Sequence, residues 1–132
     1  MVKGVFHIAT LARNLDETLK LYQSLFGGKA SKPKTIPEQG VKTVMLNLGN
    51  TSIEILEPLP ESNIARVLEK RGEGLHHICL EVDNIDQVLD SLAAKGVELI
   101  DKKARRGAEG MVAFVHPKSL KGVLVELCQP LE

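Results

Sequence analysis

The 132-residue sequence contains no tryptophan, one tyrosine, three phenylalanines and only two cysteines, and neither charge is in surplus. Cys79 and Cys128 are too few for a disulfide scaffold and lie in apolar, strand-like surroundings, so we expect buried free thiols in a reducing cytoplasm. With 17 basic and 17 acidic side chains, the chain has no excess cation to neutralise phosphates. This balance argues against a general nucleic-acid-binding protein.

Long apolar runs are also absent. The longest, Met111–Val115, is far shorter than the roughly 20 residues that a membrane helix needs, so we expect no membrane span. The first residues lack the apolar run of a secretory signal, which favours a cytoplasmic protein. A content of 43% apolar and 26% charged residues is typical of a globular protein, and the length predicts one domain over residues 1–132.

The sequence repeats itself in its landmarks. His7-Ile8 matches His77-Ile78 at a shift of 70 residues, and Ile53-Glu54-Ile55 resembles Val125-Glu126-Leu127 at a shift of 72. Each half therefore has a histidine near its start and a glutamate 47 or 49 residues later. Such a repeat predicts two similar modules, at residues 1–60 and 74–132, joined by a connector at residues 61–73.

The local patterns predict the same elements in each module. Asn14 is suited to cap the first helix, and either Asn84 or Asp83 is suited to cap the second. Gly96 is suited to end the second helix, and Gly72 to end a connector helix over Asn63–Arg71. The first helix has an apolar stripe made of Leu15, Leu19, Tyr22 and Phe26. Strands are expected at Val2–Ala9, Val41–Leu48, Ser52–Glu57, His76–Val82, Glu98–Asp101, Met111–His116 and Val123–Gln129. The prediction is an α+β fold of two tandem βαβββ modules that form a curved, cleft-lining mixed sheet.

Strand alternation indicates where the repeated residues point. Glu54 lies between two isoleucines, and Glu126 lies between Val125 and Leu127, so each glutamate faces away from its apolar neighbours. His7 and His77 alternate with apolar residues in the same way. Because the helices must cover the apolar faces, we expect the two histidines and two glutamates on the opposite faces. If the two sheets curl towards each other, the four side chains line one cleft.

Two imidazoles and two carboxylates suit a first-row divalent metal, whose charge two glutamates would neutralise while waters complete an octahedron. Taken singly, each residue has a simpler explanation. A lone strand histidine is most often a core or surface side chain, and a lone glutamate is most often solvated. The duplicated histidine and glutamate at nearly equal spacing favour the metal site.

Several further polar residues have open interpretations. His76 points to the opposite side of its strand from His77, which favours a structural role for His76. His116 is either a surface turn residue or a substrate contact. The basic stretch Lys102–Gly107 is either a solvated loop or a binding site for phosphates. Neither cysteine has a base or cation nearby in the sequence that would indicate a nucleophile.

Motifs in both halves resemble a known family. They are Pro37-Glu38-Gln39-Gly40, Glu57-Pro58-Leu59, Gly74-Leu75-His76-His77, His116-Pro117-Lys118-Ser119 and Gly122-Val123-Leu124-Val125-Glu126-Leu127. Together with the paired modules, they resemble the glyoxalase, or vicinal oxygen chelate, superfamily, and within it the methylmalonyl-CoA epimerase family. The resemblance covers nearly the whole chain.

This resemblance implies a metal-dependent enzyme that epimerises the α-carbon of a CoA thioester, methylmalonyl-CoA, through a metal-stabilised enolate. It places the metal ligands at His7, Glu54, His77 and Glu126, although glutamine occupies the position of Glu54 in some members. It implies cobalt, manganese, zinc or nickel as the cofactor, and a homodimer. Glu126 is also the expected catalytic base, through a carboxylate oxygen that the metal does not use.

One position departs from the family pattern. Some members carry a glutamate base where this chain has Thr43, and threonine is not a general base at ordinary pH. The second base is therefore open among Glu54, a metal-bound water and an unaligned residue. We predict substrate contacts at Thr43, Lys118 and Ser119, and phosphate contacts at Lys118 and the Arg105–Arg106 loop.

Three alternative functions remain at this point. The first is a glyoxalase I-type lactoylglutathione lyase, which would use a similar metal site on a glutathione hemithioacetal. The second is a metal-free small-molecule-binding module of the same fold, although that class loses ligands and all four are present here. The third is a structural protein with solvated glutamates and core histidines.

Overall fold

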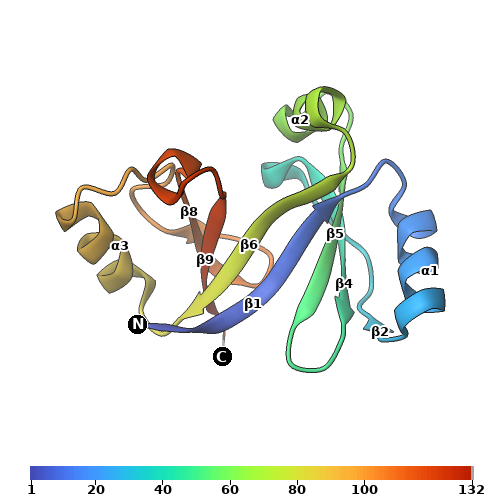
Figure 1. The fold of residues 1–132 in the computed structure, drawn as a ribbon, viewed down its shortest axis with the longest axis horizontal. Helices are drawn as coiled ribbons and strands as arrows, with labels where there is room; N and C mark the ends of the chain where they lie inside the picture. The colour runs from blue at the N-terminus through green and yellow to red at the C-terminus, as the bar shows by residue number, and fades with distance from the viewer. Residues whose placement is uncertain (132) are drawn as a thin grey trace. The chain divides into compact units, whose positions relative to one another are not determined.

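The computed structural model describes residues 1–131 and divides into two compact units (Figure 1). One unit comprises His7–His76, and the other comprises Met1–Phe6 together with the chain from His77 onward. The strand β1 (Val2–Leu11) therefore contributes residues to both. The predicted module boundaries at residues 60 and 74 stay a prediction.

In the His7–His76 unit, β4 (Val41–Asn47) is the central strand. It pairs antiparallel with β5 (Ser52–Pro58) on one side and with β2 (Lys29–Ala30) and β3 (Lys34–Ile36) on the other. β5 also runs parallel to β1. The helical elements are α1 (Leu15–Phe26), the 3₁₀ turn η1 (Pro37–Gln39) and α2 (Asn63–Arg71).

The core of this unit lies between α1 and the apolar faces of β4 and β5. Its buried members are Ala12, Leu15, Val44 and Ile55, and Ile53 packs against them. Because Ile53 and Ile55 face α1, Glu54 lies on the opposite face, as alternation predicts. The end of the predicted stripe does not join the core: Phe26 is 66% exposed and contacts the ring of Tyr22 edge-on, just before α1 ends at Gly27.

In the other unit, β6 (Gly74–Val82) runs parallel to β9 (Val125–Pro130), and β9 pairs antiparallel with β8 (Gly110–Val115). The short strand β7 (Arg105–Arg106) pairs with β8, and η2 (Pro117–Leu120) follows β8. The helix α3 (Ile85–Ala94) packs on the apolar faces of β8 and β9. The buried core residues are Val82, Ile85, Leu89, Ala113, Val115 and Leu127.

The helix signals in the sequence are confirmed. Asn14 Oδ1 accepts a hydrogen bond from the N–H of Glu17 (3.0 Å), and Asn84 Oδ1 accepts one from Gln87 (3.1 Å). Each cap satisfies a backbone donor that the helix cannot pair. Gly96 follows the end of α3 with φ of 79°, a conformation that glycine adopts without strain. Within residues 1–131, no helix has the length and apolar content needed to cross a bilayer.

The strand predictions fail at one place. No strand forms at Glu98–Asp101, where Leu99 makes only an isolated bridge to Val115. The N–H groups of Ile100 and Asp101 both donate to the carbonyl of Phe114, a convergent pattern that a regular ladder does not contain. The two- and three-residue strands β2, β3 and β7 were not predicted, because so short a segment shows no periodicity.

Candidate active site

In the His7–His76 unit, His7 and Glu54 form a buried pair. His7 Nε2 lies 3.1 Å from Glu54 Oε1, and the two residues are only 4% and 7% exposed. Ala9 is directly opposite Glu54 in the β1–β5 register, so His7 reaches Glu54 diagonally across the strands. The small Ala9 side chain leaves room for this contact.

The other unit repeats the construction. His77 Nε2 lies 3.0 Å from Glu126 Oε1, with exposures of 7% and 6%. Here Cys79 is directly opposite Glu126 in the β6–β9 register, and His77 is the diagonal neighbour. The apolar side chains beside Glu126, Val125 and Leu127, pack in the core that α3 covers, so Glu126 lies on the other face as expected.

In each pair, the distance between the histidine nitrogen and the glutamate oxygen is the distance expected between two neighbouring ligands of a metal ion. A first-row ion binds histidine nitrogen and carboxylate oxygen at about 2.1 Å, which places neighbouring ligands of an octahedron about 3.0 Å apart. A plain ion pair has a similar spacing, but it does not account for the same buried pair twice. The donor set of neutral imidazole and carboxylate therefore fits a divalent cation.

Thr43 on β4 contacts Glu54. Its hydroxyl Oγ1 donates a hydrogen bond to Glu54 Oε2 at 2.9 Å, and Thr43 is itself 5% exposed. Thr43 is opposite Leu56 in the β4–β5 register, so it is a diagonal neighbour of Glu54 on the same face. A buried carboxylate requires such donors to offset its lost hydration. The two oxygens of Glu54 thus have different partners, His7 and Thr43.

Cys79 and Cys128 lie on the face of Glu126 as buried free thiols, as the sequence predicts. A hydrogen bond with Cys128, burial and the negative charge of Glu126 together hold the pKa of the Cys79 thiol far above its ordinary value. A thiol that keeps its proton is a poor nucleophile and a poor metal ligand.

Phe114, which sequence reasoning missed, contacts His77. The two rings meet edge-on with centroids 5.3 Å apart, and Arg105 lies 5.8 Å above the Phe114 ring. Asp101 holds both neighbours, since one carboxylate oxygen accepts the N–H of Phe114 (2.8 Å) and the other accepts from Arg105 Nε (3.3 Å). Phe114 is opposite Glu126 in the β8–β9 register, a pairing that the sequence does not reveal by itself.

The residues of the His116-Pro117-Lys118-Ser119 motif form and flank η2. His116 caps this turn, with Nδ1 accepting the N–H of Lys118 at 3.0 Å, and its Nε2 lies 3.7 Å from a carboxylate oxygen of Glu98. Ser119 Oγ accepts the backbone N–H of Glu98 at 2.8 Å, and Lys118 is exposed. These contacts give His116 and Ser119 structural roles. Substrate contacts at Lys118 and Ser119 stay predictions.

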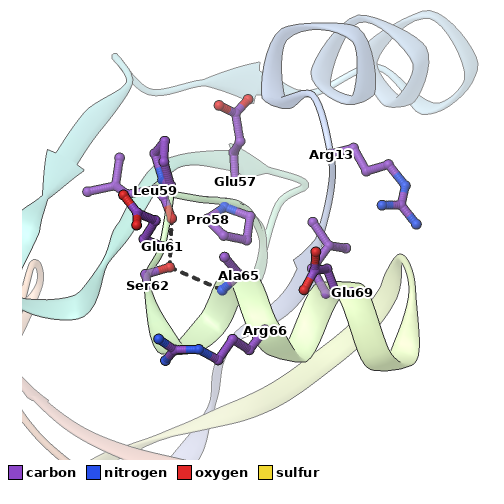
Figure 2. Close-up of a pocket in the computed structure, with 11 residues that line it drawn as sticks. Arg13, Glu57, Pro58, Leu59, Glu61, Ser62, Ala65, Arg66 and Glu69 are labelled. Atoms are coloured by element: carbon purple, nitrogen blue, oxygen red, sulfur yellow. Dashed lines mark hydrogen bonds between the residues drawn. The ribbon is translucent and has the colours of Figure 1, made fainter.

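A surface pocket of about 610 Å³ in the His7–His76 unit lies between the segment after β5 and the start of α2. Figure 2 shows charged side chains of both signs around it, together with Ser62, which accepts the N–H of Ala65 and donates to the carbonyl of Leu59. One of the lining carboxylates, Glu57, already accepts the N–H of Leu15 at the start of α1. Two residues that line the pocket therefore have structural roles, because Glu57 caps the start of α1 and Ser62 caps the start of α2.

Comparisons with known proteins agree on one family. The model of the glyoxalase/bleomycin resistance protein/dioxygenase superfamily matches residues 6–115. The mitochondrial methylmalonyl-CoA epimerase of Dictyostelium discoideum is 46% identical over 124 residues, covering 92% of this chain and 75% of that protein. The ethylmalonyl-CoA/methylmalonyl-CoA epimerase of Cereibacter sphaeroides is 38% identical over 133 residues, covering 98% and 99%.

The solved structures agree with the sequence comparison. A structure of methylmalonyl-CoA epimerase in complex with methylmalonyl-CoA and NH4+ matches with a TM-score of 0.93 at 30% identity, covering 98% of this chain and 96% of that one. The expected α+β vicinal oxygen chelate fold is thereby confirmed, as is the expectation of an enzyme. The chain belongs to the glyoxalase/bleomycin resistance protein/dioxygenase superfamily and, within it, to the methylmalonyl-CoA epimerase family.

Proposed function

We propose that this protein epimerises methylmalonyl-CoA at its α-carbon, and that His7, Glu54, His77 and Glu126 hold one divalent cation for the reaction. The observation that carries the proposal is the repeated buried pair of histidine and glutamate, at 3.1 and 3.0 Å, in a member of an epimerase family. His7, His77 and Glu126 are each buried, and each offers a donor atom of a kind that a metal ion binds.

The chemistry requires removal of a weakly acidic proton and its return to the opposite face. When bound, a divalent metal supplies Lewis-acid stabilisation of the negative charge that develops on the thioester oxygen. The carboxylate of Glu126 accepts the α-proton, and its burial keeps water from competing for that proton. His7 and His77 act as neutral donors, which leaves both carboxylates to balance the charge of the cation.

The substrate is proposed to be a CoA thioester because a relative of 30% identity was solved with methylmalonyl-CoA. Thr43, Lys118 and Ser119 remain predicted substrate contacts. Of the predicted phosphate-binding residues, Arg105 is exposed and lies over Phe114, next to His77, so it is the better-supported contact for an anionic group. A homodimer in the cytoplasm completes the proposal.

The test is solvent deuterium uptake at the α-carbon of methylmalonyl-CoA, followed together with interconversion of the two epimers. The protein is stripped of metal and then reloaded separately with cobalt, manganese, zinc or nickel. We expect exchange that disappears on stripping and returns with at least one of these ions. The same preparations receive a glutathione hemithioacetal as a second substrate.

Each result leads to a different conclusion. Tight metal binding with turnover of the hemithioacetal and no exchange on the CoA thioester would replace the proposal by a lactoylglutathione lyase. An absence of both metal binding and exchange would leave a small-molecule-binding module and would refute the four-ligand site. Exchange that persists in fully stripped protein would refute the metal requirement alone.

A further inference from the structure

We propose that Thr43 is a positioning residue that holds Glu54 as a one-oxygen metal ligand, and that Glu54 is thereby removed from the candidate bases. The inference rests on the function proposed above, since it concerns a residue beside the proposed cation.

The first support is the geometry of the Glu54 carboxylate. Oε1 lies 3.1 Å from His7 Nε2, whereas Oε2 accepts the Thr43 hydroxyl at 2.9 Å. An ionised carboxylate only accepts hydrogen bonds, so the hydroxyl must be the donor, and a charge-assisted bond of this kind is stronger than a neutral one. Threonine is branched at Cβ and has few rotamers in a strand, so the hydroxyl is well fixed. The bond therefore orients the carboxylate.

The second support comes from the other half of the chain. Thr43 is opposite Leu56, two residues after Glu54, and Val112 is opposite Cys128, two residues after Glu126. Val112 is thus the equivalent of Thr43, with a methyl group in place of the hydroxyl.

The two carboxylates therefore have different neighbours. Glu126 is opposite Cys79 in the β6–β9 register, and a thiol is a weaker hydrogen-bond donor than a hydroxyl. An oxygen that already accepts a charge-assisted hydrogen bond is a weaker proton acceptor, and two-oxygen binding of a metal by Glu54 would require the bond to Thr43 to break. Glu54 is accordingly suited to a fixed ligand role.

The experiment compares two pairs of side chains that differ by one hydroxyl. Thr43 is replaced by valine, which keeps its shape, and separately by serine and by alanine, which differ from each other only in the oxygen. Metal-free proteins are titrated with Co2+ by calorimetry, and the visible absorption of the bound ion is recorded. Thermal unfolding and circular dichroism of each variant confirm that it folds.

We expect Thr43→Val and Thr43→Ala to weaken Co2+ binding by about 10- to 100-fold, as is usual when a group that orients a metal ligand is lost. Thr43→Ser should stay close to the unchanged protein, and the absorption bands should shift only in the variants without the hydroxyl.

Unchanged Co2+ affinity and spectrum in Thr43→Val would overturn the inference. If Thr43→Val does not fold, equal affinities of the serine and alanine variants would overturn it instead. A wild-type protein that binds no Co2+ would refute the proposed function, which distinguishes that failure from a failure of the role of Thr43.

Discussion

The ring of Phe114 meets the imidazole of His77, a proposed metal ligand, edge-on with the ring centroids 5.3 Å apart, and the guanidinium of Arg105 lies over the same Phe114 ring. An edge-to-face aromatic contact contributes about 0.5–1.5 kcal/mol beyond burial, and it also limits rotation of the imidazole. A histidine that is fixed in the ligand orientation loses less entropy when it binds a metal ion. The aromatic contact thus links the β8 strand to metal affinity.

Replacement of Phe114 by leucine tests this link. Leucine keeps most of the apolar volume but removes the ring contacts with His77 and Arg105, so we expect Co2+ affinity to fall by up to about tenfold, equivalent to about 1.4 kcal/mol. Calorimetric titration measures the change. Phe26→Leu is the matched control, because Phe26 is 66% exposed on α1. Equal affinities in both variants would mean that Phe114 does not orient His77.

The two glutamates should respond differently to the same substitution. Glu126→Gln removes the proposed base and should lower deuterium exchange by about 10²–10⁴-fold, even at saturating metal. Glu54→Gln keeps an oxygen that can bind the ion and accept the Thr43 hydroxyl, so we expect weaker metal binding and exchange that recovers when more metal is added. Rates are measured over a range of Co2+ concentrations. An equal loss in the two variants at saturating Co2+ would contradict separate roles.

The environment of Cys79 should make the free energy of unfolding depend on pH. Its pKa is raised in the folded protein, first by the hydrogen bond with Cys128 and then by burial, so the folded state keeps the proton that the unfolded chain loses above about pH 8.5. Its contribution to the free energy of unfolding is therefore full below about pH 8.5 and declines as the pH rises further, by at most about 1.4 kcal/mol per unit.

Urea unfolding at pH 7.5 and 9.5, in the unchanged protein and in Cys79→Ala, measures this decline. The decline should be steeper in the unchanged protein. Dithiobis(nitrobenzoate) should react slowly with the folded chain at pH 8 and rapidly with two thiols in urea, since both cysteines are buried. Fast reaction of the folded protein that is absent from Cys79→Ala would show that the Cys79 thiol ionises there.

The sequence predicted the two histidine–glutamate pairs because a side-chain period of two and a repeat are both visible without a structure. His7 and Glu54, or His77 and Glu126, could be assigned to the faces opposite the helices before any pairing was known. The helix caps at Asn14 and Asn84 were equally local signals. These features depend on residues that are close in the chain, or on a pattern that occurs twice.

The contacts of these pairs could not be predicted in the same way. The bond between Thr43 and Glu54, and the position of Phe114 opposite Glu126, depend on strand register, which is set by the packing of whole strands. The sequence could not predict for the same reason that no strand forms at Glu98–Asp101. Two backbone N–H groups of this segment donate to one carbonyl of β8, and this pairing depends on how the segment packs on that strand. In the sequence Thr43 stands out only because it departs from the family pattern, and nothing there indicates Glu54 as its partner.

Replacing Gly110, at the start of β8, by alanine should have a large effect on stability. A Cβ at this position would lie 2.2 Å from the carbonyl oxygen of Gln129, which is backbone of the neighbouring strand and cannot move aside. Gly4 has a similar φ, 152° against 157°, but no atom lies within 4 Å of its Cβ position. We expect Gly110→Ala to lower the free energy of unfolding by about 1–3 kcal/mol more than Gly4→Ala. Urea denaturation measures both, and equal losses would show that the strands separate easily there.

Val112 offers the reciprocal test of how the two carboxylates are distinguished. Val112→Thr places a hydroxyl beside Glu126, in the register position that Thr43 has beside Glu54. If that hydroxyl donates to Glu126, the carboxylate becomes a weaker proton acceptor, so we expect the exchange rate to fall by about tenfold or more while Co2+ binding persists. Val112→Ala is the control for packing, since Val112 is 3% exposed against Cys79 and Cys128. A rate that falls equally in both variants, or in neither, would mean that the hydroxyl does not decide which glutamate carries the proton.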